Sequence, residues 1–218
     1  MRFLRADGAS WIEKSGSTPE LVREAAVLEW CAGRLPVPRV LAYKPGSITM
    51  SVLPGVSLLE ASMEEAVQAI IQALHLIHSI PIAGCPFDAG WKSRLSQGEA
   101  NIRAGLIDES DFDEDNMGRS PSDILAELRS MPQLPETCCF THGDACLPNF
   151  LTHGSELTGI IDVGRAGVTH PAQDWALAIR SVRANFGSAG ERLLRQHLPP
   201  HSQDEELLRR FRLLNELF

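Results

Sequence analysis

Two short polar stretches on either side of a strand-length segment constrain this chain more than any other feature. The first is HGDACLPN, residues 142–149, and the second is IIDVG, residues 160–164. Runs of β-branched and apolar residues at 138–141 and 157–163, with a turn at 153–154 between them, predict a strand, a loop and a returning strand. Asp144, Asn149 and Asp162 therefore belong to one hairpin, which carries two carboxylates and one carboxamide.

These three side chains suit phosphoryl transfer. Hard oxygen ligands are what Mg²⁺ requires, and a carboxylate beside an attacking hydroxyl can orient it and accept its proton. Protein kinases carry the same residue types at matching spacing, in H-R-D-x-x-x-x-N followed by D-F-G. Asp, Asn and Gly are also common turn residues, so either stretch alone is compatible with a simple turn. The two stretches together, in order and between strand signals, favour the catalytic interpretation.

Strand signals are early and few in the rest of the chain, whereas helical signals come later. We predict strands at residues 11–14, from residue 40 and at 48–53, and helices from about residue 19 and at 63–78, 91–106, 120–128, 173–184, 189–196 and 205–217. This order predicts an α+β fold, in which a small sheet lobe is joined to a larger, mainly helical lobe.

Charge and composition narrow the class of partner. The 218 residues are 44% apolar and carry a net charge of −8, which argues against a nucleic-acid surface and suits a cationic partner. No apolar run is long enough for a spanning helix and the start has no signal-peptide core, so we expect a cytoplasmic protein without a membrane segment. The five cysteines include no C-x-x-C pair, which favours reduced thiols, although Cys146 lies inside the first motif and is a candidate reactive thiol.

Both motifs resemble the core of aminoglycoside 3′-phosphotransferases. For the second motif, the resemblance extends along the run IIDVGRAGVTHPAQDWALA. Six further stretches resemble this family in its order: WIEKSGS, LVREAAVLEW, GRLPVPRVL, CPF, AGLIDESDFDED and RRFRLLNELF. The resemblance implies a protein-kinase-like two-lobed fold, with residues 1–54 as a reduced N-terminal nucleotide-binding lobe and residues 55–218 as the catalytic and substrate-binding lobe. It also leads us to expect an N-terminally truncated member, which begins at the family's second or third strand and lacks the loop over the triphosphate.

The resemblance assigns roles to the motif residues. It makes Asp144 the catalytic base, Asn149 and Asp162 the Mg²⁺ ligands, and Lys14 the contact for the α- and β-phosphates of ATP, paired with Glu24. Independently, a strand lysine followed by a helix glutamate is what a buried ammonium needs to stay charged and aimed at phosphate.

The resemblance also locates the nucleotide base and the acceptor. Main-chain groups of Ser51 and Leu53 are expected to bind adenine. The positions expected to bind a small cationic aminoglycoside are Asp111, Asp113, Glu114, Arg165, Arg180, Glu216 and Phe218. An acidic run such as residues 108–115 is by itself more typical of a solvated loop, but beside a kinase motif it favours a polyamine ligand.

A few positions test the resemblance further. We expect His142 to position the loop backbone and Asp174 to brace it. At the positions of Ser181 and Asn215 the family usually has an Asp, and family members contact the aminoglycoside there. His170 also stands where the family usually has an Asp. Two alternatives stay open: a kinase of another small alcohol, such as a sugar, a choline-like amine or a macrolide, and an inactive truncated relic that only binds ligand.

Overall fold

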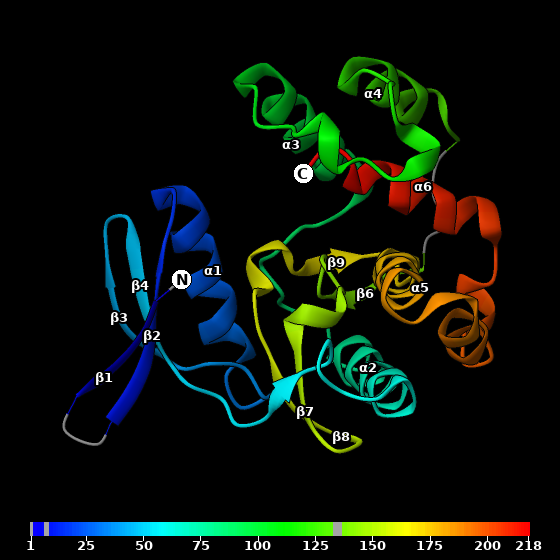
Figure 1. The fold of residues 1–218 in the computed structure, drawn as a ribbon. Helices are drawn as coiled ribbons and strands as arrows, with labels where there is room; N and C mark the ends of the chain where they lie inside the picture. The colour runs from blue at the N-terminus through cyan, green and yellow to red at the C-terminus, as the bar shows by residue number, and fades with distance from the viewer. Residues whose placement is uncertain (1, 7–8, 133–136) are drawn as a thin grey trace.

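The N-terminal part is an antiparallel sheet with one helix against it. The computed structural model describes residues 2–6, 9–132 and 137–218, and its first sheet has the order β1-β2-β4-β3. Its strands are β1 Arg2–Ala6, β2 Ala9–Ser15, β3 Val40–Lys44 and β4 Ser47–Ser51. Helix α1, Thr18–Cys31, packs on β3 and β4 (Figure 1). Strand β1 was not predicted, because a five-residue run that mixes charged and apolar residues gives no clear period.

Two further small sheets lie beyond this part. Strands β5 Val56–Ser57, β7 Phe150–His153 and β8 Glu156–Ile160 form one in the order β5-β7-β8, and β6 Cys139–Thr141 pairs with β9 Gly167–Thr169 in the other. Phe150 pairs with Ile160, and Thr141 pairs with Gly167. The loop from β6 to β7 and the loop from β8 to β9 are therefore opposite each other, and they contain the two motifs.

The remaining chain is mainly helical. Its helices are α2 Met63–His78, α3 Trp91–Ala104, α4 Pro121–Ser130, α5 Ala172–Arg195 and α6 Glu205–Asn215. The bounds of α2 are those predicted, and a capping box of Ser62 and Glu65 fixes its start. Gly187, at φ 65°, interrupts α5, which agrees with the two separate helices expected on either side of it. The structure confirms the α+β class.

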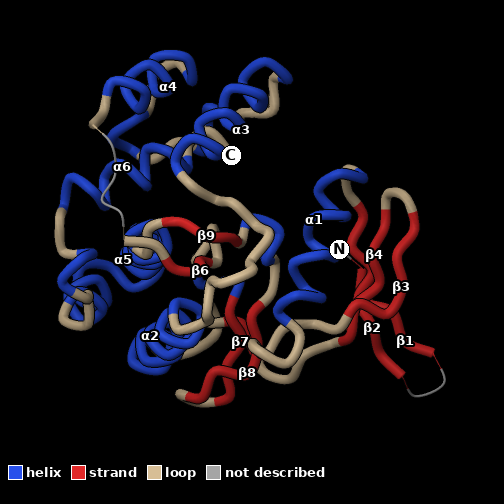
Figure 2. Tube along the Cα trace, turned by 180° about the vertical axis from the view of Figure 1, so that it is seen from behind, coloured by secondary structure: helices blue, strands red, loops and turns tan. Residues whose placement is uncertain are grey.

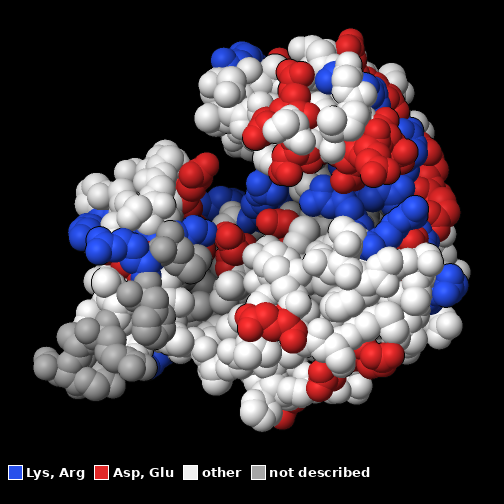
Figure 3. Space-filling view, in the orientation of Figure 1, with Lys and Arg blue, Asp and Glu red and all other residues white. Residues whose placement is uncertain are grey.

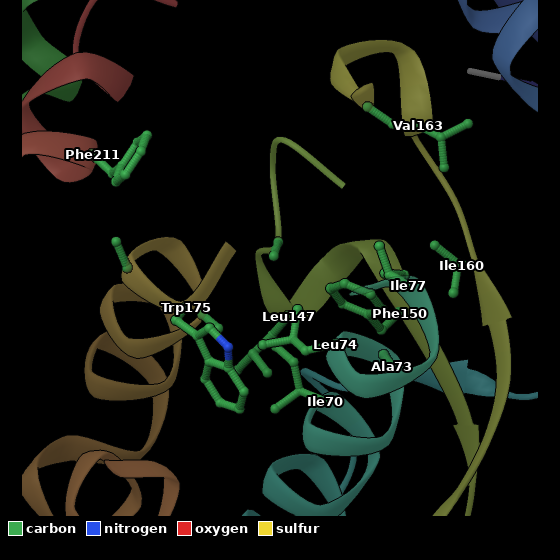
Figure 4. Packing of buried hydrophobic residues seen from close by; sticks show 14 of the residues in the cluster. Ile70, Ala73, Leu74, Ile77, Leu147, Phe150, Ile160, Val163, Trp175 and Phe211 are labelled. Atoms are coloured by element: carbon green, nitrogen blue, oxygen red, sulfur yellow. The ribbon is translucent and has the colours of Figure 1, made fainter. Parts of the chain in front are cut away.

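The core supports the first motif from below. Helices α2 and α5 pack together, and Figure 4 shows Ile70 and Leu74 of α2 near Trp175 of α5, with Leu147 and Phe150 above them. All five side chains are fully buried. Burial of side chains of this size is worth about 1.5–3 kcal/mol each. The loop of residues 142–149 is therefore anchored by its own apolar members.

The sheet with α1 and the helices α3, α4 and α6 lie on different sides of this core (Figure 2). Figure 3 shows a hollow between the N-terminal part and the rest of the molecule, where basic and acidic side chains gather. In the described ranges, no helix combines the length and the apolar character that crossing a bilayer requires.

Candidate active site

A buried carboxylate fixes the loop that carries Asp144. Asp174, at the start of α5, is 0% exposed, and its two oxygens accept the main-chain N–H groups of His142 (2.8 Å) and Gly143 (2.9 Å). His78 of α2 contacts the same carboxylate at 2.9 Å. Gly143 has φ +83°, and a Cβ there would collide with the carbonyl oxygen of Arg165. The structure thus confirms the expected bracing by Asp174.

His142 joins the two motif loops. Its Nε2 lies 2.9 Å from the carbonyl oxygen of Ile161, and its Nδ1 accepts the N–H of Asp144 at 3.2 Å. Because Nδ1 accepts, Nε2 carries the proton and donates. The imidazole is committed at both nitrogens, as expected for a residue that positions the backbone.

The electrostatic surroundings keep Asp144 ionised. Its side chain is partly buried, and burial raises its pKa, but the Arg165 guanidinium and, more weakly, His142, Cys146 and Arg180 outweigh this and hold the pKa below its usual range. A carboxylate at neutral pH can accept both a hydrogen bond and a proton from a hydroxyl group.

Asn149 and Asp162 present oxygen atoms on opposite loops. Asn149 is buried, and its Nδ2 donates to the carbonyl oxygen of Asp144 at 2.9 Å, which leaves the amide oxygen as an acceptor for another partner. Asp162 has φ 58° and is, among the described residues, the sole non-glycine with positive φ. Such a backbone costs of order 1–3 kcal/mol and persists where its surroundings enforce it, often at functional sites.

Lys14 links the sheet, α1 and the second motif. Its Nζ lies 2.8 Å from Oε2 of Glu24 and 2.8 Å from Oδ1 of Asp162. Burial lowers the pKa of Lys14, but the two carboxylates more than compensate and raise it, so the ammonium stays charged. The expected Lys14–Glu24 pair is present. The second partner, Asp162, was not predicted.

An open pocket of about 340 Å³ lies beside this ion pair. Its apolar lining includes Ile12, Pro38 and Met50, and Ser51 lies at its edge. The N–H of Ser51 donates to the carbonyl oxygen of Arg39 at 2.9 Å, so an adenine contact from Ser51 would use its carbonyl oxygen. Strand β4 ends at Ser51, and Leu53 follows it as a half-buried residue outside the sheet.

The acidic run forms two short 3₁₀ turns, η1 Glu109–Asp111 and η2 Glu114–Asn116. Asp111 and Glu114 are exposed, whereas Asp113 is half-buried and lies 3.5 Å from Arg180. Glu216 is buried, and its Oε1 accepts from the N–H of Asp113 at 3.0 Å and from Nδ2 of Asn116 at 2.7 Å. The structure therefore brings the acidic run and the C-terminal end together.

The last residue packs against two arginines. The guanidinium of Arg94 lies 4.9 Å from the centre of the Phe218 ring, and that of Arg165 lies 5.3 Å from it. With Asn215 and Gly143, these residues line a pocket of about 220 Å³. Phe218 and Arg165, two of the predicted substrate positions, are thus neighbours.

The structure also shows the surroundings of Ser181 and Cys146, two residues that the sequence analysis singled out. Ser181 is buried, and its Oγ accepts the N–H of Leu147 at 3.0 Å, so it supports the motif loop and is not an open substrate contact. Cys146 is not an activated thiol, because burial and then the nearby Asp144 carboxylate raise its pKa to about 12.

The oxygen donors fit Mg²⁺ bound together with a nucleotide. This ion usually takes one or two protein ligands and completes its shell with phosphate oxygens and water. Asp162, with a side chain 44% exposed, and the amide oxygen of Asn149 provide such a pair. No cluster of three His, Cys, Asp or Glu side chains suited to a metal occurs in residues 2–6, 9–132 and 137–218.

The braced carboxylate loop, the strand lysine with its helix glutamate, and the two-part fold define a kinase-like phosphotransferase. The model of the phosphotransferase enzyme family (APH) matches residues 3–213, and the chain belongs to this family.

Relatives and solved structures agree with this assignment. The aminoglycoside 3′-phosphotransferase of Streptomyces fradiae is 33% identical over 91% of this chain and 80% of its own length. That of Niallia circulans is 31% identical over 89% of this chain and 78% of its own length. The crystal structure of an aminoglycoside 3′-phosphotransferase of type VIII matches with a TM-score of 0.89 and 28% identity, over 99% of this chain and 88% of that chain. An aminoglycoside phosphotransferase from Streptomyces rimosus, solved with ADP and streptomycin, shares the fold at 23% identity and a TM-score of 0.83, over 97% of this chain and 88% of that chain.

Proposed function

We propose that this chain transfers the γ-phosphoryl group of ATP to a hydroxyl of an aminoglycoside, specifically the 3′-hydroxyl, and so confers resistance to the antibiotic in the cytoplasm. The observation that carries the proposal is the ion pair of Lys14 with both Glu24 and Asp162, opposite the braced loop of Asp144. The relatives named aminoglycoside 3′-phosphotransferases support the choice of acceptor and of hydroxyl.

The N-terminal lobe, residues 1–54, supplies most of the nucleotide site in this proposal. Adenine enters the pocket lined by Ile12 and Met50 and bonds to main-chain groups of Ser51 and Leu53. Lys14 contacts the α- and β-phosphates, where a fixed ammonium stabilises negative charge. The pocket's apolar walls and open mouth suit a flat base with a charged tail.

The catalytic lobe, residues 55–218, supplies the metal ligands and the base. Asn149 and Asp162 would hold Mg²⁺, which when bound neutralises phosphate charge. Asp144 orients the acceptor hydroxyl and takes its proton as the oxygen attacks the γ-phosphorus. The new oxygen–phosphorus bond forms while the bond to the bridging β–γ oxygen breaks, and ADP leaves with those electrons.

Carboxylates bind the aminoglycoside ammonium groups in this proposal. Asp111, Asp113 and Glu114 face solvent wholly or in part, so charge-assisted hydrogen bonds to a polyamine are available to them. Glu216 adds charge and fastens the run through Asp113 and Asn116. The remaining proposed contacts are Arg165, Arg180 and Phe218, where Arg180 orients Asp113 and Phe218 covers Arg165.

An ADP-release assay tests the proposal. Purified protein with Mg·ATP is given kanamycin B, its 3′-deoxy counterpart tobramycin, a macrolide or choline. We expect turnover with kanamycin and none above background with the other three. Turnover with tobramycin would refute the 3′ position, and turnover with only a macrolide or choline would refute the aminoglycoside. Stabilisation by Mg·ATP without turnover of any acceptor would indicate a binding-only relic.

A further inference from the structure

Two arginines on different helices grip the turn that follows Asp162. Arg23 of α1 donates from Nε to the carbonyl oxygen of Gly164 and from Nη2 to that of Ala166, both at 2.9 Å. Arg94 of α3 donates from Nη2 to the carbonyl oxygen of Arg165 at 3.0 Å. Three consecutive carbonyl groups thus each accept a hydrogen bond from an arginine side chain. No sequence pattern predicted these contacts.

Neither arginine is explained by an ion pair. In the described part of the chain, no carboxylate forms a salt bridge with Arg23 or Arg94. Arg94 is buried, and its Nη2 also lies 3.3 Å from the carbonyl oxygen of Gly143. Burying a guanidinium without a counter-ion is costly, and the hydrogen bonds to these carbonyl groups offset that cost. Both arginines therefore direct their hydrogen bonds mainly to this turn, while the guanidinium of Arg23 also lies over the Phe87 ring and that of Arg94 over the Phe218 ring.

The turn that accepts these hydrogen bonds, residues 162–166, begins at a residue with an unfavourable backbone conformation. Asp162, at its start, has the left-handed backbone described above, and its side chain is partly exposed. A strained backbone of this kind persists only when neighbouring contacts over-determine it. Within the turn, the N–H of Ala166 donates a main-chain hydrogen bond to the carbonyl oxygen of Val163 at 2.9 Å.

We propose that Arg23 and Arg94 are positioning residues that clasp the Asp162–Ala166 turn from two sides and thereby aim the Asp162 carboxylate at the metal-bound nucleotide. Helix α1 contributes two contacts to this turn. Glu24 pairs with Lys14, which in turn pairs with Asp162, and Arg23 donates a hydrogen bond to the main-chain carbonyl oxygen of Gly164. Arg94 connects the same turn to the loop of Asp144 through Gly143. The inference rests on the proposed function only in taking Mg·nucleotide as the ligand.

The test is calorimetric binding of ADP with and without Mg²⁺. Arg23→Gln and Arg94→Gln should each weaken Mg·ADP binding about tenfold while changing Mg-free ADP binding less than about twofold, as expected for the loss of charged hydrogen bonds that act through a metal ligand. Arg23→Lys, which retains the charge and can make one of the two bonds, should restore part of the affinity. The control variants are Arg34→Gln, just after α1, and Arg103→Gln, in α3, which replace exposed arginines. Both should leave the affinities for Mg·ADP and for Mg-free ADP unchanged.

Equal losses with and without Mg²⁺, or unchanged Mg·ADP binding in folded variants, would overturn the clasp. If a glutamine variant fails to fold, the lysine variant of that arginine, Arg23→Lys or Arg94→Lys, replaces it, and its smaller loss of affinity should again be larger for Mg·ADP than for Mg-free ADP. Amide hydrogen exchange across residues 163–166 adds a readout independent of any nucleotide, and we expect faster exchange in the glutamine variants than in the parent. Exchange as slow as in the parent would overturn the clasp even if the parent bound no Mg·ADP, a result that would separately refute the proposed function.

Discussion

The nucleotide side and the acceptor side of the candidate site are built differently. Lys14 already contacts both Glu24 and Asp162, and Asn149 donates a hydrogen bond to the carbonyl oxygen of Asp144. On the acceptor side, Asp111 and Glu114 are exposed. A phosphate site gains from fixed charges that need no reorganisation, whereas a set of exposed carboxylates can adapt to several polyamines. We therefore expect substitutions on the first side to affect turnover and those on the second to affect acceptor affinity.

The largest effect is expected at Asp144. Asp144→Asn removes the proton acceptor but keeps the shape, and turnover should fall by about 10²–10⁴-fold in a steady-state assay. The melting temperature should change little, because the loop is braced by Asp174 and not by the Asp144 carboxylate. Asp123→Asn, at an exposed position in α4, is the matched control. Near-normal kcat in the Asp144 variant would exclude it as the base.

Next in size is the loss of the strand lysine. Lys14→Ala removes the cation between two carboxylates and should lower kcat/KM for ATP about 10–100-fold, the range for a lost charged hydrogen bond or two. Lys44→Ala, on strand β3 of the same sheet, removes a lysine that is 69% exposed and pairs with Glu13, and should be nearly silent. Similar losses for both lysines would show that general charge, and not the paired geometry, matters.

A smaller and differently distributed effect is expected in the acidic run. The triple change Asp111→Asn, Asp113→Asn and Glu114→Gln should raise KM for kanamycin about tenfold and leave KM for ATP within about twofold. Glu109→Gln with Asp115→Asn neutralises two acids of the same run that have no proposed contact. If that pair raised KM as much as the triple change, the run would act through its total charge only.

The last prediction concerns stability and pH, and not turnover or acceptor binding. Burial, then the nearby His201 and His78, lowers the pKa of His170 from 6.5 to about 4, so the folded protein holds this imidazole neutral. Between pH 6.5 and pH 4 the unfolded chain binds more protons at His170 than the folded protein does. The free energy of unfolding should therefore fall as the pH falls from 6.5 toward 4. At pH 5 the loss attributable to this group is about 2 kcal/mol.

Chemical denaturation at pH 7 and pH 5 measures this loss. His170→Asn should show a smaller difference between the two pH values than the parent. An identical difference in both proteins would assign the pH dependence to other groups.

The sequence predicted local features best. Helix α2 was predicted to its ends because its apolar spacing is regular and Ser62 caps its start. Strands β5, β7 and β9 were missed, because runs of two to four residues have no readable period. The motif pattern placed Asp144, Asn149 and Asp162 near one another, but the predicted pairing of residues 138–141 with 157–163 is wrong. Strand β6 pairs with β9 and β7 pairs with β8, so the two motifs flank a hairpin.

Long-range pairing was beyond the sequence. Lys14 and Asp162 are 148 positions apart, and no periodicity indicates which carboxylate a strand lysine reaches. The same holds for Arg23 and Arg94, whose partners are main-chain carbonyl groups that have no residue signature. The role of Ser181 was not predicted either, because its hydroxyl accepts the backbone N–H of Leu147, a contact that residue type alone does not reveal.

Product analysis tests the central claim most directly. The protein is incubated with Mg·ATP and kanamycin, and the antibiotic is recovered for mass spectrometry and phosphorus–proton correlation NMR. The account predicts a single added phosphoryl group on the 3′-oxygen, absent from the Asp144→Asn reaction. Unmodified kanamycin recovered from a folded preparation that binds ATP would contradict this claim, and so would a phosphoryl group on another oxygen.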